Sequence, residues 1–130
     1  MQITKVQLYT DEPVLELGAR SIVDGVDDIE LVLVTCEAES IASDAAVGRP
    51  DVIVLDQTPQ IHFGVISEIV KSAPDSKVVL WVRSITAAMA GQSLELGVKG
   101  ILRKQLRPEL FLKCIRRVAE GELWFEQGII

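Results

Sequence analysis

The chain has 130 residues, the usual size of one domain, and at 48% its hydrophobic fraction is large enough for a core of its own. Aromatic residues make up only 5%, so the core must be aliphatic. The formal net charge of −6 is the wrong sign for a domain that by itself binds nucleic acid or an anionic membrane surface.

The predicted location follows from features that the sequence lacks. No charged segment precedes an apolar one at the amino terminus, and no apolar run approaches 18 residues. Two cysteines, Cys36 and Cys114, lie far apart without metal-binding spacing, which suits a reducing compartment where cysteine acts as a small hydrophobic residue. We therefore expect a soluble cytoplasmic protein.

In chain order, the predicted elements alternate between strands and helices. Apolar runs at 6–9, 31–34, 52–55, 78–82 and 101–102 predict five strands, and the central runs are nearly continuous, as in strands that are buried on both faces. Helical spacing of apolar residues lies between these runs and after the last one. Pro13 and Pro108 suit the first turns of helices, and Gly97 suits a helix end.

This alternation predicts an α/β fold in three layers. Strand–helix units repeated five times pack most simply as a doubly wound, five-stranded parallel sheet with helices on both faces and right-handed crossovers. We expect the flavodoxin-like strand order 2-1-3-4-5. No linker, internal repeat or low-complexity segment interrupts the pattern.

Chemistry-bearing residues follow several of the predicted strands. Thr10, Asp11 and Glu12 follow the first strand, Asp56 the third and Lys104 the fifth. Because loops at the carboxyl ends of parallel strands converge on one crevice, these side chains should meet there. Clustered carboxylates favour a hard cation with oxygen ligands, and a nearby lysine could contact an anion.

The same residues resemble a known family over about 5–126. The stretch Asp51-Val-Ile-Val-Leu-Asp56, the acidic Asp11-Glu12-Pro13 and the stretch Gly97-Val-Lys-Gly-Ile-Leu-Arg-Lys104 are similar to motifs of the receiver (CheY-like) domains of bacterial two-component response regulators, of the NarL/LuxR type. The resemblance implies that Asp56 accepts a phosphoryl group from a histidine kinase and that Lys104 contacts the phosphoryl oxygens. It also implies a Mg²⁺ ion held by Asp11, Asp56 and the backbone of Thr58.

Three positions depart from that family pattern. Thr10 replaces the first of two adjacent acids, Val82 replaces the Thr or Ser that normally bonds the phosphoryl group, and Ile101 replaces the switch aromatic. A hydroxyl supplies no charge, so Mg²⁺ affinity should fall, and Val82 can donate no hydrogen bond. We therefore expect the phosphoacceptor to be retained and the conformational switch to be weakened.

The same resemblance also suggests the domain boundaries and the partners. We expect a receiver domain at 1–126, a short tail at 127–130, and a homodimer through the last strand and helix. Basic residues at Arg103, Arg107, Lys113 and Arg116 would meet acids of the other copy in that dimer. The sequence 119–125 is similar to the exit from receivers that continue into a DNA-binding domain, which makes the parent protein a transcription regulator by resemblance.

Two functions of different classes stay open at this point. One is a phosphorylation-controlled receiver, and the alternative is a pseudo-receiver that serves as a dimerisation or interaction module without phosphorylation. An enzyme that acts on a small molecule is not expected, because no glycine-rich phosphate loop, GxSxG motif or Cys–His pairing is present. The other notable residues have simpler explanations. We expect His62 to be an exposed loop residue, Trp81 a core residue and the pair Arg116–Arg117 a solvated helix face. The aromatic residues Trp124 and Phe125 would either fold back on the domain or contact a partner.

Overall fold

The computed structural model describes residues 2–125 as alternating strands and helices. The elements in chain order are β1 (Thr4–Tyr9), α1 (Pro13–Asp24), β2 (Ile29–Thr35), a short 3-10 turn η1 (Ala38–Ser40), α2 (Ile41–Gly48), β3 (Val52–Asp56), α3 (Phe63–Ser72), β4 (Lys77–Val82), α4 (Ala87–Leu96), β5 (Gly100–Arg103) and α5 (Pro108–Ala119). All five predicted strands are confirmed, and each extends one to three residues beyond the predicted run in total.

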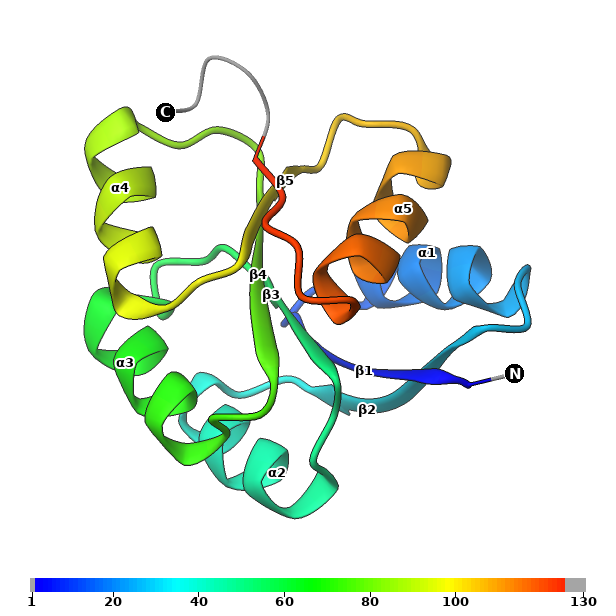
Figure 1. Cartoon of the computed structure of the whole chain (residues 1–130), viewed down its shortest axis with the longest axis horizontal. Coiled ribbons are helices and arrows are strands. Elements are labelled where there is room, and N and C mark those ends of the chain that lie inside the picture. The colour runs from blue at the N-terminus through cyan, green and yellow to red at the C-terminus, as the bar shows by residue number, and fades with distance from the viewer. Residues whose placement is uncertain (1, 126–130) are drawn as a thin grey trace.

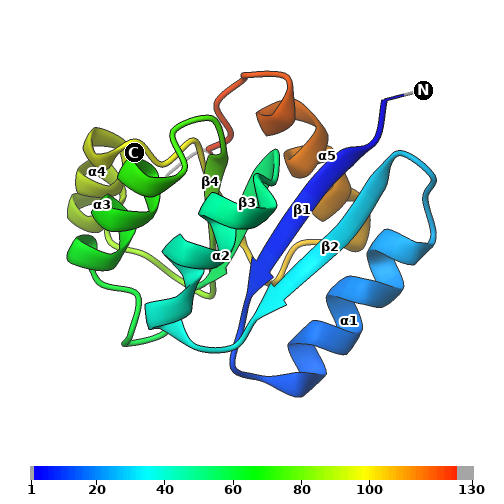
Figure 2. The same ribbon diagram turned by 90° about the horizontal axis from the view of Figure 1, so that it is seen from below.

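The strands form one parallel sheet in the order β2-β1-β3-β4-β5. Figures 1 and 2 show α1 and α5 on one face of the sheet and α2, α3 and α4 on the other. The predicted fold class and strand order are therefore confirmed. None of the described helices combines the length and the apolar character that a membrane-crossing segment needs.

Two separate hydrophobic clusters fill the space on either side of the sheet. In the central strand β3 every residue is buried, and its side chains alternate between the clusters. Ile53 and Leu55 join the cluster under α2, α3 and α4, whereas Val52 and Val54 join the cluster under α1 and α5. This double burial explains why the sequence of β3 is continuously apolar rather than alternating.

Proline and glycine mark the helix ends where the sequence predicts them. Pro13 and Pro108 are the first residues of α1 and α5, where the missing N–H costs no helical hydrogen bond. Gly97 ends α4 with a φ of 110°, a conformation that favours glycine, and an added Cβ would lie 3.1 Å from Val70. Gly97 thus ends α4 shortly before β5 begins at Gly100.

The segment after α5 returns along β5. Trp124 donates its backbone N–H to the carbonyl of Lys99 at 3.0 Å and accepts the N–H of Ile101 at 2.9 Å, which forms a parallel bridge to Gly100. Trp124 packs on the cluster under α5, and Phe125 packs on the cluster under α4. The aromatic residues therefore fold back on the domain, while the predicted tail at 127–130 lies outside the described residues.

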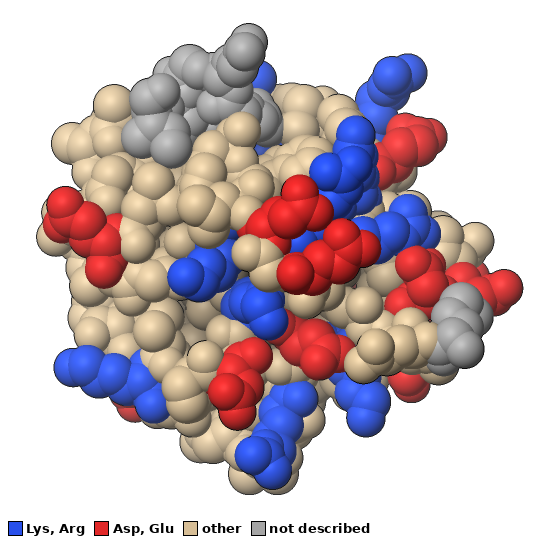
Figure 3. Space-filling view, viewed as in Figure 1, with Lys and Arg blue, Asp and Glu red and all other residues tan. Residues whose placement is uncertain are grey.

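Charged side chains are intermixed on the face that carries α5 and the returning segment. Figure 3 shows Lys and Arg groups beside Asp and Glu groups rather than apart from them. Arg116 donates two hydrogen bonds to the carboxylate of Asp28, at 2.7 and 2.9 Å, and Arg117 lies 3.5 Å from Glu122. Both arginines are thus paired within the chain.

Candidate functional site

Asp56 is the last residue of β3, and none of its surface is exposed. The register places it opposite Trp81 of β4. One carboxylate oxygen, Oδ1, forms an ion pair with the ammonium of Lys104 and has no other partner among the described residues. The other, Oδ2, accepts a hydrogen bond of 2.8 Å from the hydroxyl of Thr10. The carboxylate is therefore held from two sides, by one cation and one neutral donor.

Lys104 is fixed at the end of β5 by its backbone and by an aromatic wall. Its N–H donates to the carbonyl of Val82 at 2.7 Å, and its ammonium lies 5.7 Å from the centre of the Trp81 ring. The Trp81 ring packs edge-on against Phe111 of α5, with the ring centres 5.4 Å apart. Trp81 is buried as expected, but its contact with the lysine ammonium, a cation–π geometry, was not predicted from the sequence.

Three carboxylates converge at this position. Asp11, Glu12 and Asp56 each offer an oxygen atom, and these atoms all lie within 4.8 Å of one another. Their mutual repulsion favours a hard divalent cation with oxygen ligands, so the residues present suit Mg²⁺. Glu12 was not predicted as a ligand, although its place directly after Asp11 in the same loop is a signal that could have identified it.

The carbonyl of Thr58, expected to face the ion, already accepts two hydrogen bonds. The backbone N–H of Ile61 donates to it at 3.0 Å and the side-chain amide of Gln57 at 3.3 Å, both within the short turn that follows β3. The hydroxyl of Thr58 shares a hydrogen bond of 3.2 Å with the hydroxyl of Tyr9. Burial raises the pKa of Tyr9, and the negative charges of Asp11, Asp56 and Glu39 add to that increase.

A hollow of about 490 Å³ opens above these groups. Its walls come from the loops after β1, β3, β4 and β5, and its lining residues are Asp11, Glu12, Gln57, Thr58, Pro59, Gln60, Arg83, Ser84 and Lys104. The structure thus brings Asp11, Asp56, Lys104 and Thr58 together at the carboxyl edge of the sheet.

The three positions that depart from the family pattern are all buried. Thr10 is 2% exposed and contacts Asp56 directly, whereas Val82 and Ile101 are fully covered in the cluster under α4. Val82 brings an aliphatic group and no hydroxyl to the end of β4. Ile101 brings no ring to β5.

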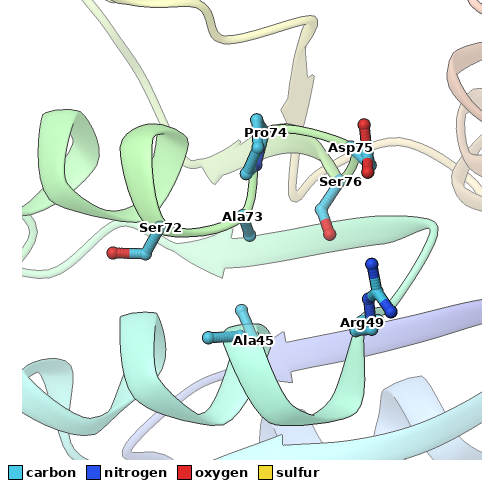
Figure 4. Close-up of a pocket in the computed structure, with 8 residues that line it drawn as sticks. Ala45, Arg49, Ser72, Ala73, Pro74, Asp75 and Ser76 are labelled. Atoms are coloured by element: carbon cyan, nitrogen blue, oxygen red, sulfur yellow. The ribbon is translucent and has the colours of Figure 1, made fainter.

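A second hollow lies at the opposite, amino edge of the sheet. Figure 4 shows it between the end of α2 and the connection from α3 to β4, with Arg49, Asp75 and Ser76 around it. Arg49 has a φ of 48°, the one positive value outside glycine among the described residues, where it ends α2. Ser76 donates to the carbonyl of Pro50 at 2.6 Å, which ties the two loops together and gives the region a structural role.

The remaining candidate residues lie outside the acidic cluster and the hollow above it. His62 is exposed, as predicted, and directly precedes α3. Cys114 is buried in the core, but Cys36 is exposed on the loop after β2, so it does not serve as the small core residue that the sequence suggested. Both cysteines are free thiols.

Comparison with known proteins finds relatives along almost the whole chain, although no protein-family model matches. The transcriptional regulatory protein YxjL of Bacillus subtilis is 27% identical over 123 residues, 93% of this chain and 56% of that protein. The oxygen regulatory protein NreC of Staphylococcus epidermidis and a nitrate/nitrite response regulator homologue of Haemophilus influenzae are each 26% identical, over 96% of this chain and 59% and 61% of theirs. The chain spans less than two thirds of the length of these relatives.

Solved structures match the fold closely. A LuxR-family two-component response regulator from Aurantimonas superposes with a TM-score of 0.89 at 18% identity, covering 98% of this chain and 93% of that one. The signal receiver domain of NarL from Mycobacterium tuberculosis gives a TM-score of 0.84 at 21% identity, covering 94% of this chain and all of the other. The chain is therefore similar in sequence to bacterial response regulators, and it has the fold of the receiver domains of NarL and LuxR-family response regulators.

Proposed function

We propose that this domain accepts a phosphoryl group on Asp56 from the phosphohistidine of a histidine kinase. The observation that carries the proposal is the buried carboxylate of Asp56, paired with Lys104 beneath a hollow whose rim carries Asp11 and Glu12. This arrangement places a nucleophile, a cation for the phosphoryl oxygens and acidic groups for a metal in one place.

In the proposed transfer, Oδ1 of Asp56 attacks the phosphorus atom. The P–N bond to the donor imidazole breaks, the electron pair leaves with the imidazole, and the new P–O bond makes an acyl phosphate. Lys104, which pairs with Oδ1 before the reaction, moves its ammonium onto an oxygen of the phosphoryl group. Because both reactants are anions, the step depends on neutralising charge rather than on proton transfer.

Mg²⁺ would be held by Asp11, Glu12 and Asp56, and when bound it supplies positive charge between the carboxylates and the phosphoryl oxygens. The carbonyl of Thr58 would have to give up one of its two hydrogen bonds to become a further ligand. With Thr10 in place of an acid, we expect an affinity on the order of millimolar.

The regulatory output is inferred from the relatives. YxjL is a transcriptional regulatory protein and NreC an oxygen regulatory protein, so we propose that this domain controls a DNA-binding transcription regulator. The domain would be modified as a signalling element rather than act as an enzyme on a small molecule. The pseudo-receiver alternative is not favoured, because Val82 and Ile101 alter the switch and leave the acceptor and its cation in place.

Phosphorylation can be tested with a small acyl-phosphate donor and Mg²⁺. We expect the intact protein to gain one phosphate, which hydroxylamine removes because it is an acyl phosphate. Asp56→Asn should abolish the gain, and Lys104→Ala should slow it. An unmodified wild-type protein at saturating Mg²⁺ and donor would contradict the proposal and restore the pseudo-receiver.

A second copy of the chain is the other proposed partner. Arg103, Arg107 and Lys113 lie on β5, on the loop after it and on α5, where they could meet acidic groups of another protomer. Arg103 and Arg116 of the predicted basic edge already interact within the chain, Arg116 with Asp28, so the proposed contact rests on Arg107 and Lys113. Sedimentation of the phosphorylated and unphosphorylated domain measures this directly: we expect a dimer at high concentration, and a monomer throughout would rule the contact out.

A further inference from the structure

Thr10 occupies a position where its hydroxyl has two partners. It is the residue after β1, it is 2% exposed, and its Oγ1 accepts the backbone N–H of Glu12 at 3.1 Å. The same hydroxyl lies 2.8 Å from Oδ2 of Asp56. Because the Glu12 N–H can only donate and an ionised carboxylate can only accept, the hydroxyl proton must point to Asp56.

Few residue types can make both bonds at one atom. A serine or threonine hydroxyl donates and accepts, whereas an aspartate at position 10 could accept from Glu12 but would repel Asp56. A valine of the same shape could do neither. Thr10 therefore not only removes an acidic group from this position but also adds a hydrogen-bond donor that binds the carboxylate of Asp56.

We propose that Thr10 positions the phosphoacceptor, an inference that rests on the proposed function of Asp56. The hydroxyl holds Oδ2 on the side of the acidic loop and thereby turns Oδ1 toward Lys104 and the incoming phosphoryl group. It also fixes the backbone of Glu12, so that the loop carrying Asp11 and Glu12 keeps its place relative to Asp56. The Thr10 hydroxyl and the Lys104 ammonium therefore order the acceptor before a metal ion binds.

This arrangement predicts how phosphorylation depends on Mg²⁺. Since the carboxylate is already oriented, Mg²⁺ is needed for charge neutralisation but not for ordering Asp56. Replacing Thr10 by aspartate removes the donor and adds a negative charge beside a buried carboxylate. Orientation and stability should then come to depend on the cation.

The first test compares the maximal rate of phosphate uptake at saturating Mg²⁺ in Thr10→Val and Thr10→Ser. We expect Thr10→Val to be slower on the order of tenfold, since a hydrogen bond to a charged group is lost, with the half-saturating donor concentration unchanged. Thr10→Ser should stay within about twofold of wild type because it keeps the hydroxyl. Thr4→Val is the matched control, the same change at the opposite end of β1, where we expect no effect.

The second test uses the unphosphorylated protein and measures its melting temperature with and without Mg²⁺. Thr10→Asp should gain a larger Mg²⁺-induced increase than wild type, because the cation relieves the added repulsion, and Thr10→Val should not. A purely structural Thr10 would lower the melting temperature of Thr10→Val and leave the rate of phosphate uptake per folded molecule unchanged. If Thr10→Val does not fold, Thr10→Ser and Thr10→Asp still decide the matter.

The inference fails if wild type and Thr10→Val take up phosphate at equal rates, or if Thr10→Asp shows the wild-type Mg²⁺ response. The proposed function fails in a different way, namely if the wild-type protein takes up no phosphate at all. The two failures are therefore distinguishable.

Discussion

At the scale of single residues, the site is defined by how charge is buried. The carboxylate of Asp56 is fully covered and the Lys104 side chain is only 9% exposed, so each compensates for the desolvation of the other. Removing one partner from such a pair leaves a buried charge without compensation, which is costly. A phosphoryl group would bring new anionic oxygens to the same cation. We therefore expect the position of the Lys104 ammonium to differ between the phosphorylated and the unphosphorylated domain.

We propose that Val82 weakens the conformational response to phosphorylation. It ends β4, it is fully buried, and its carbonyl binds the N–H of Lys104. Val82→Thr should strengthen the response to a phosphoryl mimic, because the new hydroxyl can bond the added oxygens. Amide exchange over 83–94, with and without the mimic, measures this.

The same variant should cost about 1–3 kcal/mol of unfolding free energy without the mimic, since the hydroxyl enters an apolar cluster. Val79→Thr, buried on the same strand but in the other cluster, controls for the cost of a hydroxyl alone. Equal exchange differences in wild type and Val82→Thr would remove Val82 from the explanation of a weak switch.

At the scale of elements, the segment that follows α5 adds a short edge to β5. The segment can approach this closely because Gly100 has no side chain. A Cβ at this position would lie 3.3 Å from Val118 and Val79 and 3.4 Å from the Cβ of Trp124. The indole Nε1 of Trp124 is buried without a hydrogen-bond partner among the described residues, which weakens the docking. Two backbone hydrogen bonds of Trp124 and close packing thus hold the segment against β5.

Gly100→Ala should loosen this edge. We expect the amide of Ile101 to exchange faster and Trp124 fluorescence to shift toward that of an exposed indole, because the added methyl pushes against the returning chain. Gly18→Ala is the matched control, since nothing lies within 4 Å of a Cβ there. Unchanged exchange at Ile101 in Gly100→Ala would show that the core absorbs the methyl and that the edge does not depend on Gly100.

The strands and their order could be predicted because burial on two faces leaves a direct mark on sequence. In a chain of alternating strands and helices, a short continuous apolar run such as that of β3 is best explained by a strand that is buried on both faces. Pro13 and Pro108 likewise mark the starts of two helices. Asp56 and Lys104 followed from their places at strand ends. The docking of Trp124 on β5 did not follow, since an aromatic tail fits both a folded-back segment and a partner contact.

Contacts that depend on side-chain orientation could not be predicted from sequence. The bond from Thr10 to Asp56 needs a particular rotamer and loop shape, so the sequence showed only that an acid was missing. Likewise, the two hydrogen bonds that the Thr58 carbonyl accepts, from the Gln57 side chain and the Ile61 backbone N–H, depend on the tight turn after β3. Glu12, by contrast, could have been assigned to the acidic cluster from its place directly after Asp11.

At the scale of the whole molecule, one ion pair joins parts that are far apart in the chain. Arg116 of α5 binds Asp28, the residue before β2, with two hydrogen bonds across 88 residues of sequence. The hydrogen bond from Arg116 holds the pKa of Asp28 below its ordinary value. The unfolded chain therefore binds more protons than the folded one as the pH falls toward that range.

The stability from this pair is present above the ordinary pKa of aspartate, near 4, and is lost as the pH falls through the lower folded-state value. Arg116→Gln should lower the unfolding free energy at pH 7 by about 0.5–1 kcal/mol, a small effect because the side chains of Arg116 and Asp28 are 40% and 33% exposed. Denaturant unfolding from pH 7 to pH 2 should show the difference shrinking. Arg117→Gln, next to it and 3.5 Å from Glu122, controls for loss of a surface charge, and an Arg116 effect independent of pH would contradict the assignment.

The central claim is that Asp56 carries the phosphoryl group, and the most direct measurement locates the modification on the chain. The protein is treated with an acyl-phosphate donor and Mg²⁺ and then with hydroxylamine, which converts an acyl phosphate into a hydroxamate on the same side chain. Peptide mass spectrometry should find the hydroxamate at Asp56 and at neither Asp11 nor Asp51, and Asp56→Asn should yield none. A hydroxamate at another carboxylate, or none in the wild-type protein, would contradict the claim.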